Sequence, residues 1–184
     1  AHPNLQVIVN TVICADNHAE VVPFARYLAG TGLLDGHFFE VVRGDPPDKR
    51  IRDVPPDALR CTYEAVLPLQ ANYVRQSVRR LSGLRRVWRR VEGIGALVYR
   101  YRTQWAVHSH SARWPNKCVA GESIAVVDYN GRMRVCELRD ASVDLAEHNY
   151  NFAAARETTI MLTERKAAKS HECDCTHVCF VNTS

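Results

Sequence analysis

The sequence predicts an α/β fold, and three features carry this prediction. Two short apolar runs, at residues 5–13 and 36–44, flank a segment with helical periodicity. A strand, a helix and a second strand within about forty residues form a βαβ unit, which builds parallel sheet. After Ser123 the apolar residues recur with a period of two, which indicates a β-hairpin.

The composition is that of an ordinary folded protein. The chain has 184 residues, 46% of them hydrophobic, which is enough for a buried core. Its 24 basic and 20 acidic side chains leave a formal net charge of +4, and this near balance argues against a nucleic-acid partner. No run of apolar residues is long enough to span a bilayer, so we expect no membrane partner.

The first βαβ unit has recognisable ends. Residues 5–13 are apolar on both faces, which is typical of a buried strand in a parallel sheet. A helix is expected over 18–32, with Asp16 or Asn17 as N-cap; if Asn17 is the cap, Glu20 completes a capping box. Gly32 ends this helix.

A long helical region follows the second strand. The prolines after residues 36–44 exclude a helix until Asp57, which can cap the next one. Helical spacing then continues over 58–114, with a break expected at residues 82–83 or 93–95, where glycines occur.

Arginines and apolar residues alternate through the middle of this region. The pattern predicts an amphipathic helix with an apolar side in the core and a basic side in solvent. The alternative is a surface that binds phosphate, nucleic acid or a protein partner. The apolar positions are Val74, Val78, Leu81, Leu84, Val87 and Val91, and the basic ones are Arg75, Arg79, Arg80, Arg85, Arg86, Arg89 and Arg90.

The last third begins with a predicted hairpin of strands 124–128 and 132–138. Asn130 and Gly131 can adopt the positive φ angles that a two-residue turn needs. Residues 144–169 are expected to be helical. The expected inward positions of that helix are Phe152, Ala155, Ile160 and Met161.

The cysteines are the main chemical feature of the chain. Seven is an odd number and the spacing is uneven, which favours a reducing compartment, here the cytoplasm, over a secreted disulfide scaffold. Thiolates from separate segments suit a cubane iron–sulfur cluster. Zinc is the alternative, with His171 or His177 as a nitrogen ligand. Five cysteines crowd the last third, namely Cys118, Cys136, Cys173, Cys175 and Cys179.

The arrangement of these cysteines resembles the auxiliary-cluster domain of radical S-adenosylmethionine (SAM) enzymes, called SPASM in its long form and twitch in its short form. Cys118 is followed by a G-x4-C element, Gly131 to Cys136, and then by the C-x-C-x3-C group at the end of the chain. The upstream strands and helix resemble late βα units of the partial barrel that precedes that domain. The resemblance implies the last units of a partial (β/α) barrel with a long helical connection over 1–114, and a small α+β cluster domain with a hairpin over 115–184.

The same resemblance implies a cofactor and its ligands. One auxiliary [4Fe–4S] cluster, used for electron transfer, would be held by Cys118, Cys136 and two of Cys173, Cys175 and Cys179. The C-x3-C-x2-C motif that binds the SAM-cleaving cluster in the family is absent from these residues. We therefore expect this chain to be the C-terminal portion of a longer enzyme that carries SAM and a second [4Fe–4S] cluster, and to be inactive alone.

Three polar residues are further candidates for binding. Asn10 and Thr11 are expected to end the first strand, where the family contacts the ribose of SAM. Arg43, at the end of the second strand, could meet a carboxylate or phosphate, or could pair with Asp45 or Asp48.

The resemblance also implies partners. These are a small-molecule or peptide substrate and a reductant such as flavodoxin or ferredoxin. The competing interpretation is a zinc-stabilised binding module that docks nucleic acid or a protein partner through its arginine-rich helix.

Overall fold

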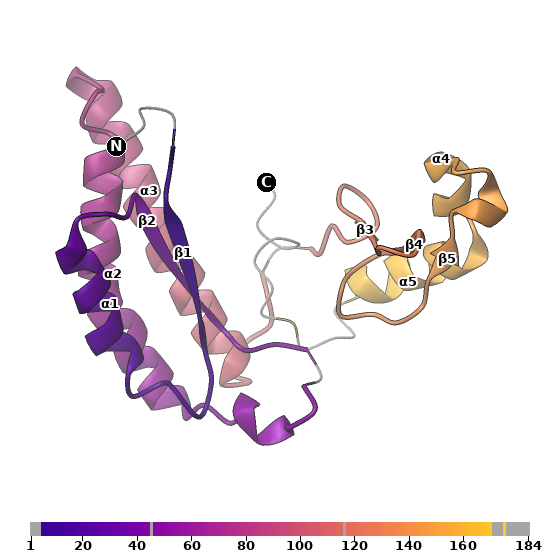
Figure 1. Ribbon diagram of the computed structural model, residues 1–184, viewed down its shortest axis with the longest axis horizontal. Coiled ribbons are helices and arrows are strands. Elements are labelled where there is room, and N and C mark those ends of the chain that lie inside the picture. The colour runs from indigo at the N-terminus through magenta and orange to yellow at the C-terminus, as the bar shows by residue number, and fades with distance from the viewer. Residues whose placement is uncertain (1–4, 45, 116, 171–174, 176–184) are drawn as a thin grey trace. The chain divides into compact units, whose positions relative to one another are not determined.

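The chain divides into two compact units, residues 1–112 and 113–184. The computed structural model describes residues 5–44, 46–115, 117–170 and 175 (Figure 1). These residues combine helices with two small sheets, so the α/β class predicted from the sequence is confirmed.

The first unit is built on the predicted βαβ unit. Strands β1 (Ile8–Ile13) and β2 (Gly36–Val41) are parallel, with Ile8 opposite Gly36 and Ile13 opposite Val41. Helix α1 (Val21–Thr31) joins them and ends at Gly32, whose φ of 66° is the left-handed C-cap that the sequence predicts.

Two long helices complete this unit. A 3₁₀ turn, η1 (Lys49–Arg52), leads into α2 (Pro56–Ser77), and α3 (Gly83–His108) follows. Helix α2 packs against α1, β2 and α3 (Figure 1). The break between α2 and α3 covers residues 78–82 and so includes Ser82 of the predicted break, whereas the helix continues through 93–95.

The core of the first unit combines apolar packing with a buried polar network. Phe39, Leu59 and Val66 are fully buried where β2 meets the helices. Tyr63 and Tyr101 stack with ring centroids 4.3 Å apart. Burial raises the pKa of both tyrosines above the ordinary value, so their hydroxyls stay protonated and remain donors.

These donors are satisfied by glutamine side chains. Tyr63 donates to Gln104 Oε1 at 2.9 Å, and Tyr101 donates to Gln70 Oε1. The amide of Gln70 in turn donates to the carbonyl of His37 at 2.5 Å. The network therefore ties β2 to both long helices.

Some details of the first unit differ from the predictions. Strand β1 is not buried on both faces, because Ile8 and Val12 are 54% and 47% exposed on this edge strand. The prediction of a capping box at the start of α1 is also wrong. Asn17 instead accepts a hydrogen bond from Cys14 N and donates one to Val12 O, both at 2.9 Å, so it closes the turn after β1. Helix α1 consequently begins only at Val21, and Asp57 lies in the first turn of α2 rather than at its cap.

The apolar side of the arginine-rich helix does not face the core throughout. Val78 is 7% exposed, as the amphipathic pattern predicts. Leu84, Val87 and Val91 are exposed, since residues 82–92 lie in water on all sides. The prediction is wrong for these three residues, because periodicity identifies a stripe but not what covers it.

The second unit contains the predicted hairpin in a three-stranded antiparallel sheet. Asp128 N donates to Arg132 O and Gly131 N donates to Asp128 O, at 2.9 and 3.0 Å. Only Gly131 in this loop has a positive φ, 78°. The predicted two-residue turn is therefore wrong, and a three-residue loop closed by a left-handed glycine takes its place. The strands are β3 (Val126–Val127), β4 (Arg132–Arg134) and β5 (Val143–Asp144).

The expected single helix over 144–169 is divided. Asn151 accepts from Ala154 N at 3.1 Å and Thr158 accepts from Met161 N at 3.4 Å, so each caps a new helix. Of the expected inward residues, Ala155 and Met161 are fully buried, but Phe152 and Ile160 are exposed. The resulting elements are the 3₁₀ turn η2 (Ala146–His148), α4 (Phe152–Arg156) and α5 (Thr159–Lys169).

Candidate metal centre

Cys136 is buried immediately beyond β4. Met133 and Val135 are fully buried and Cys136 is 7% exposed, so the return arm of the hairpin carries the thiol into the core of the second unit. The backbone N–H of Leu138 donates to Cys136 Sγ at 3.4 Å. Because an N–H donor stabilises negative charge on sulfur, this environment suits a thiolate ligand.

Cys118 is buried in the loop that precedes the hairpin. Its exposed fraction is 8%. Three residues later Gly121 has a φ of 75°, and a Cβ placed on it would lie 2.7 Å from Val135 Cγ1. Glycine thus permits the loop after Cys118 to pack directly on the residue that precedes Cys136.

Cys175 is linked to the start of the second unit. The indole N–H of Trp114, a residue only 5% exposed, donates to the Cys175 carbonyl. This bond holds one tail cysteine next to Trp114, four positions before Cys118 in the sequence.

Ion pairs attach α5 to the surrounding loops. Glu164 of α5 pairs with Arg139, and Lys169 pairs with Glu122. The Lys169 ammonium lowers the pKa of Glu122 through their hydrogen bond. These pairs connect the last helix to the segments that carry Cys118 and Cys136.

The described residues do not assemble a complete ligand set. Among them, no three His, Cys, Asp or Glu side chains gather as a metal site. Cys173 and Cys179, two of the predicted ligands, lie outside the described residues. In the first unit Cys14 is half-buried and Cys61 is exposed on α2.

The polar candidates of the first unit lie elsewhere than expected. Asn10 and Thr11 are in the middle of β1, which continues to Ile13, so the prediction that they end the strand is wrong. Asn10 is exposed, whereas Thr11 Oγ1 is 2.8 Å from His37 Nε2. Burial lowers the pKa of this histidine.

Arg43 has a partner that the sequence did not indicate. It follows β2, as predicted, and its Nη1 is 2.6 Å from Glu40 Oε2. Both side chains are partly buried. The guanidinium of Arg43 therefore forms an ion pair with a carboxylate three residues earlier in the chain.

Sequence reasoning missed an apolar cavity of about 420 Å³ between α2 and α3. The Arg60 guanidinium lies 5.7 Å from the centre of the Trp105 ring at this cavity. The sequence did contain a pattern that indicates this cavity, since the residues that line it recur every three or four positions on two consecutive helices. The lining residues are Arg60, Tyr63, Glu64, Leu67, Val98, Tyr101, Arg102 and Trp105.

Within the described parts of the chain, no helix is both long and apolar enough to cross a membrane. Comparisons of the sequence with protein-family models and with curated proteins, and of the fold with solved structures, found no match.

Proposed function

We propose that the second unit binds one [4Fe–4S] cluster as the auxiliary centre of a radical SAM enzyme. The observation that supports this best is the buried Cys136 thiol with the Leu138 N–H directed at its sulfur. A buried thiol needs no donor as a small apolar group, whereas a thiolate ligand is stabilised by one. Cys118, buried in the adjoining loop, is the second ligand.

The tail supplies the remaining ligands. Two of Cys173, Cys175 and Cys179 complete a set of four thiolates, as the C-x-C-x3-C ending suggests. The bond from Trp114 to the Cys175 carbonyl supports this part, because it ties the tail to the segment leading to Cys118. Such a cluster exchanges single electrons at a potential set by burial and by N–H···S bonds.

The wider proposal follows from the family resemblance. The first unit is the end of a partial barrel, and the enzyme also carries SAM and its own [4Fe–4S] cluster on residues beyond this chain. The enzyme acts in the cytoplasm on a small molecule or peptide, with a flavodoxin or ferredoxin as reductant. Asn10, Thr11 and Arg43 stay the candidate binding residues of the first unit, where Thr11 Oγ1 also lies 2.8 Å from His37 Nε2 and Arg43 also pairs with Glu40.

Anaerobic reconstitution with iron and sulfide tests the cluster. We expect a brown protein with broad absorption at about 400 nm and roughly four irons and four sulfides per chain. A colourless protein that binds stoichiometric zinc and unfolds with chelators would contradict the cluster and favour the zinc-stabilised module.

Cysteine variants assign the ligands. Cys118→Ser and Cys136→Ser should each lose most of the bound iron, whereas Cys14→Ser and Cys61→Ser are matched controls that should retain it. Among single serine variants of the three tail cysteines, two should lose iron and one should not. Equal iron content in the Cys136→Ser variant and the controls would remove the central ligand of the proposal.

The radical SAM assignment has a separate test. The full-length gene product should contain a C-x3-C-x2-C motif before Ala1 and should cleave SAM under reducing conditions. Absence of SAM cleavage in the full-length protein, with the auxiliary cluster intact, would leave a cluster-binding protein without this activity.

A further inference from the structure

The N-terminal part of α3 carries an apolar stripe that nothing in the described part of the first unit covers. Leu84, Val87, Trp88 and Val91 are 87%, 58%, 70% and 62% exposed. They occupy positions i, i+3, i+4 and i+7, which share an arc of about 100° on a helix. Leu97, which faces the core, is 7% exposed and lies on another side of α3.

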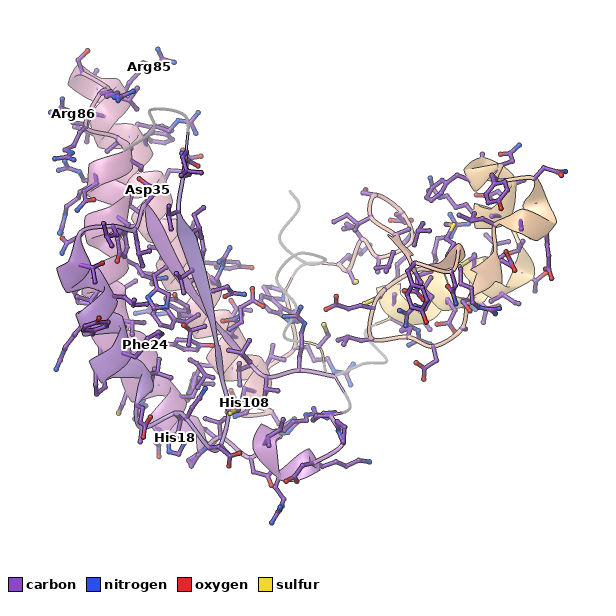
Figure 2. All side chains as sticks on the ribbon, viewed as in Figure 1. His18, Phe24, Asp35, Arg85, Arg86 and His108 are labelled. Atoms are coloured by element: carbon purple, nitrogen blue, oxygen red, sulfur yellow. The ribbon has the colours of Figure 1, made fainter. Side chains whose placement is uncertain are left out.

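Positive charge surrounds this stripe. Residues 79–92 contain six arginines and a single acidic residue, Glu92, so a net charge of +5 lies on 14 residues. Arg85 and Arg90 flank the stripe, each about 60° beyond one of its edges. Figure 2 shows Arg85 and Arg86 at the N-terminal end of α3.

Most of these charges are available to a partner. Among the described residues, Arg79, Arg80, Arg85 and Arg90 form no ion pair, and Arg89 pairs with Glu92 at 2.9 Å on the open surface. Such an exposed pair is weak and competes poorly with a multivalent anion.

Arg86 has a structural role at the same end of the helix. Its guanidinium donates to the carbonyls of Leu81 and Arg79 at 2.6 and 2.9 Å. These bonds close the turn between α2 and α3, so the stripe and its arginines are presented on a fixed helix rather than on a loose arm.

We propose that residues 83–92 of α3, the arginine-rich segment, dock on an anionic lipid surface with Leu84, Val87, Trp88 and Val91 in the headgroup region. An interfacial helix combines an aliphatic and tryptophan face with flanking basic side chains that reach the lipid phosphates. The expectation of no membrane partner came from the absence of a spanning run. A helix that lies in the plane of the interface needs no such run.

Other occupants match the segment less well. Nucleic acid would neutralise the arginines but leave the aliphatic stripe in water. A second copy of the same face would bring like charges together. An acidic protein groove would have to supply both acids and an apolar floor, whereas an anionic bilayer presents both.

Flotation of the whole chain with vesicles tests the proposal. We expect binding to phosphatidylcholine vesicles that contain roughly one third phosphatidylserine, and none to pure phosphatidylcholine. Raising sodium chloride from about 0.1 to 0.5 M shortens the Debye length from about 10 to roughly 4 Å and should release the protein. These two measurements need no variant.

Two double variants separate charge from insertion. Each arginine near an anionic surface contributes about fivefold to partitioning, so Arg85→Glu with Arg90→Glu should lower it at least about 30-fold. Leu84→Ser with Trp88→Ser should lower it about tenfold or more at unchanged charge. All four positions are exposed, so the unfolding midpoints should not change.

Arg26→Glu with Lys166→Glu is the matched control. Both positions are exposed and the change in net charge equals that of the arginine variant, so binding should fall much less. Equal losses for the control and the arginine variant would overturn a local site, and unchanged flotation of the Leu84/Trp88 variant would overturn insertion. Failure to float, with tight binding to a labelled single-stranded RNA or to an acidic protein, would replace the lipid surface by that partner. Iron content is not a readout here, so the result is independent of the cluster proposal.

Discussion

Two glycines of α3, Gly93 and Gly95, lie two positions apart on the same helix but have different surroundings. A Cβ built on Gly93 would lie 2.8 Å from Val74 Cγ1 of α2, and the same atom on Gly95 would meet nothing within 4 Å. Replacing each with alanine therefore gives the same change in helix propensity and a different change in packing.

The two contributions have opposite signs at Gly93. Alanine is favoured over glycine inside a helix by about 0.8–1.0 kcal/mol, and at Gly95 this gain should appear undiminished. At Gly93 the new methyl group overlaps Val74, whose side chain has one strongly preferred rotamer in a helix. Overpacking of this kind costs about 1–3 kcal/mol. We expect Gly93→Ala to range from neutral to about 2 kcal/mol destabilising, roughly 1–3 kcal/mol below Gly95→Ala.

Urea unfolding followed by far-ultraviolet circular dichroism measures the difference. Gly95→Ala should raise the unfolding midpoint of the first unit and Gly93→Ala should leave it unchanged or lower it, with equal slopes. Combining Gly93→Ala with Val74→Ala removes the overlapping methyl groups and should restore part of the loss, which appears as a coupling free energy of about 0.5–3 kcal/mol. If Gly93→Ala stabilises as much as Gly95→Ala, the close approach of α2 and α3 at Val74 is refuted.

Four further substitutions test the glycine turns, the buried histidine and the polar network. Gly131→Ala should cost about 1–2 kcal/mol of unfolding free energy from backbone strain alone, since its φ is 78° and its Cβ would meet no atom. Gly121→Ala should cost more, because its Cβ would also overlap core atoms; equal losses in chemical denaturation would contradict this difference. Burial lowers the pKa of His37, so the unfolded chain binds more protons below its usual value of 6.5, and stability should fall as the pH drops through and below 6.5. His37→Gln should flatten that decline in midpoints measured from about pH 7.5 to 5.5, and an equally steep decline in the variant would exclude His37 as its source. Tyr101→Phe should cost about 1–3 kcal/mol in urea unfolding because Gln70 loses its buried donor, and a neutral result would show that the bond contributes nothing.

Local signals in the sequence predicted the parts of the fold that local forces determine. Gly32 ends α1 because only glycine readily adopts the left-handed C-cap, and Ser82 and Gly83 mark the start of α3 after the break that follows α2. The parallel pairing of β1 and β2 followed from the length and order of the segments. The helix ends depend on a few neighbouring residues, and the strand pairing depends on the order of the elements, so a single sequence carries the information.

The predictions of the turns were wrong where a residue type is compatible with two local arrangements. Asn17 is a good N-cap by residue type, but its amide bonds to Cys14 and Val12 on the strand side instead. Asn130 can adopt a positive φ, yet the hairpin places only Gly131 there. Propensity permits both arrangements in each case, and the hydrogen bonds formed within the loop decide between them.

Burial was the least predictable property, because it depends on what lies across from a residue. Val78 and Val87 belong to the same apolar pattern, but the first is 7% exposed and the second 58% exposed. The pattern thus defines a face with a preference for an apolar environment. An apolar face that is exposed in the described part of the first unit therefore supports the proposal of a partner that covers it.

The candidate site shows the same division between residue type and surroundings. Cys61 and Cys136 are the same residue type. In the sequence, the spacing of Cys136 from Gly131 sets it apart from Cys61. The structure distinguishes them by different means: Cys61 is exposed on a helix, whereas Cys136 is buried and its sulfur accepts a backbone N–H. Spacing and environment are independent of each other, and both select Cys136 as the thiol suited to a ligand role. The loss of iron expected for Cys136→Ser, set against Cys61→Ser, is therefore the comparison on which the metal centre depends most directly.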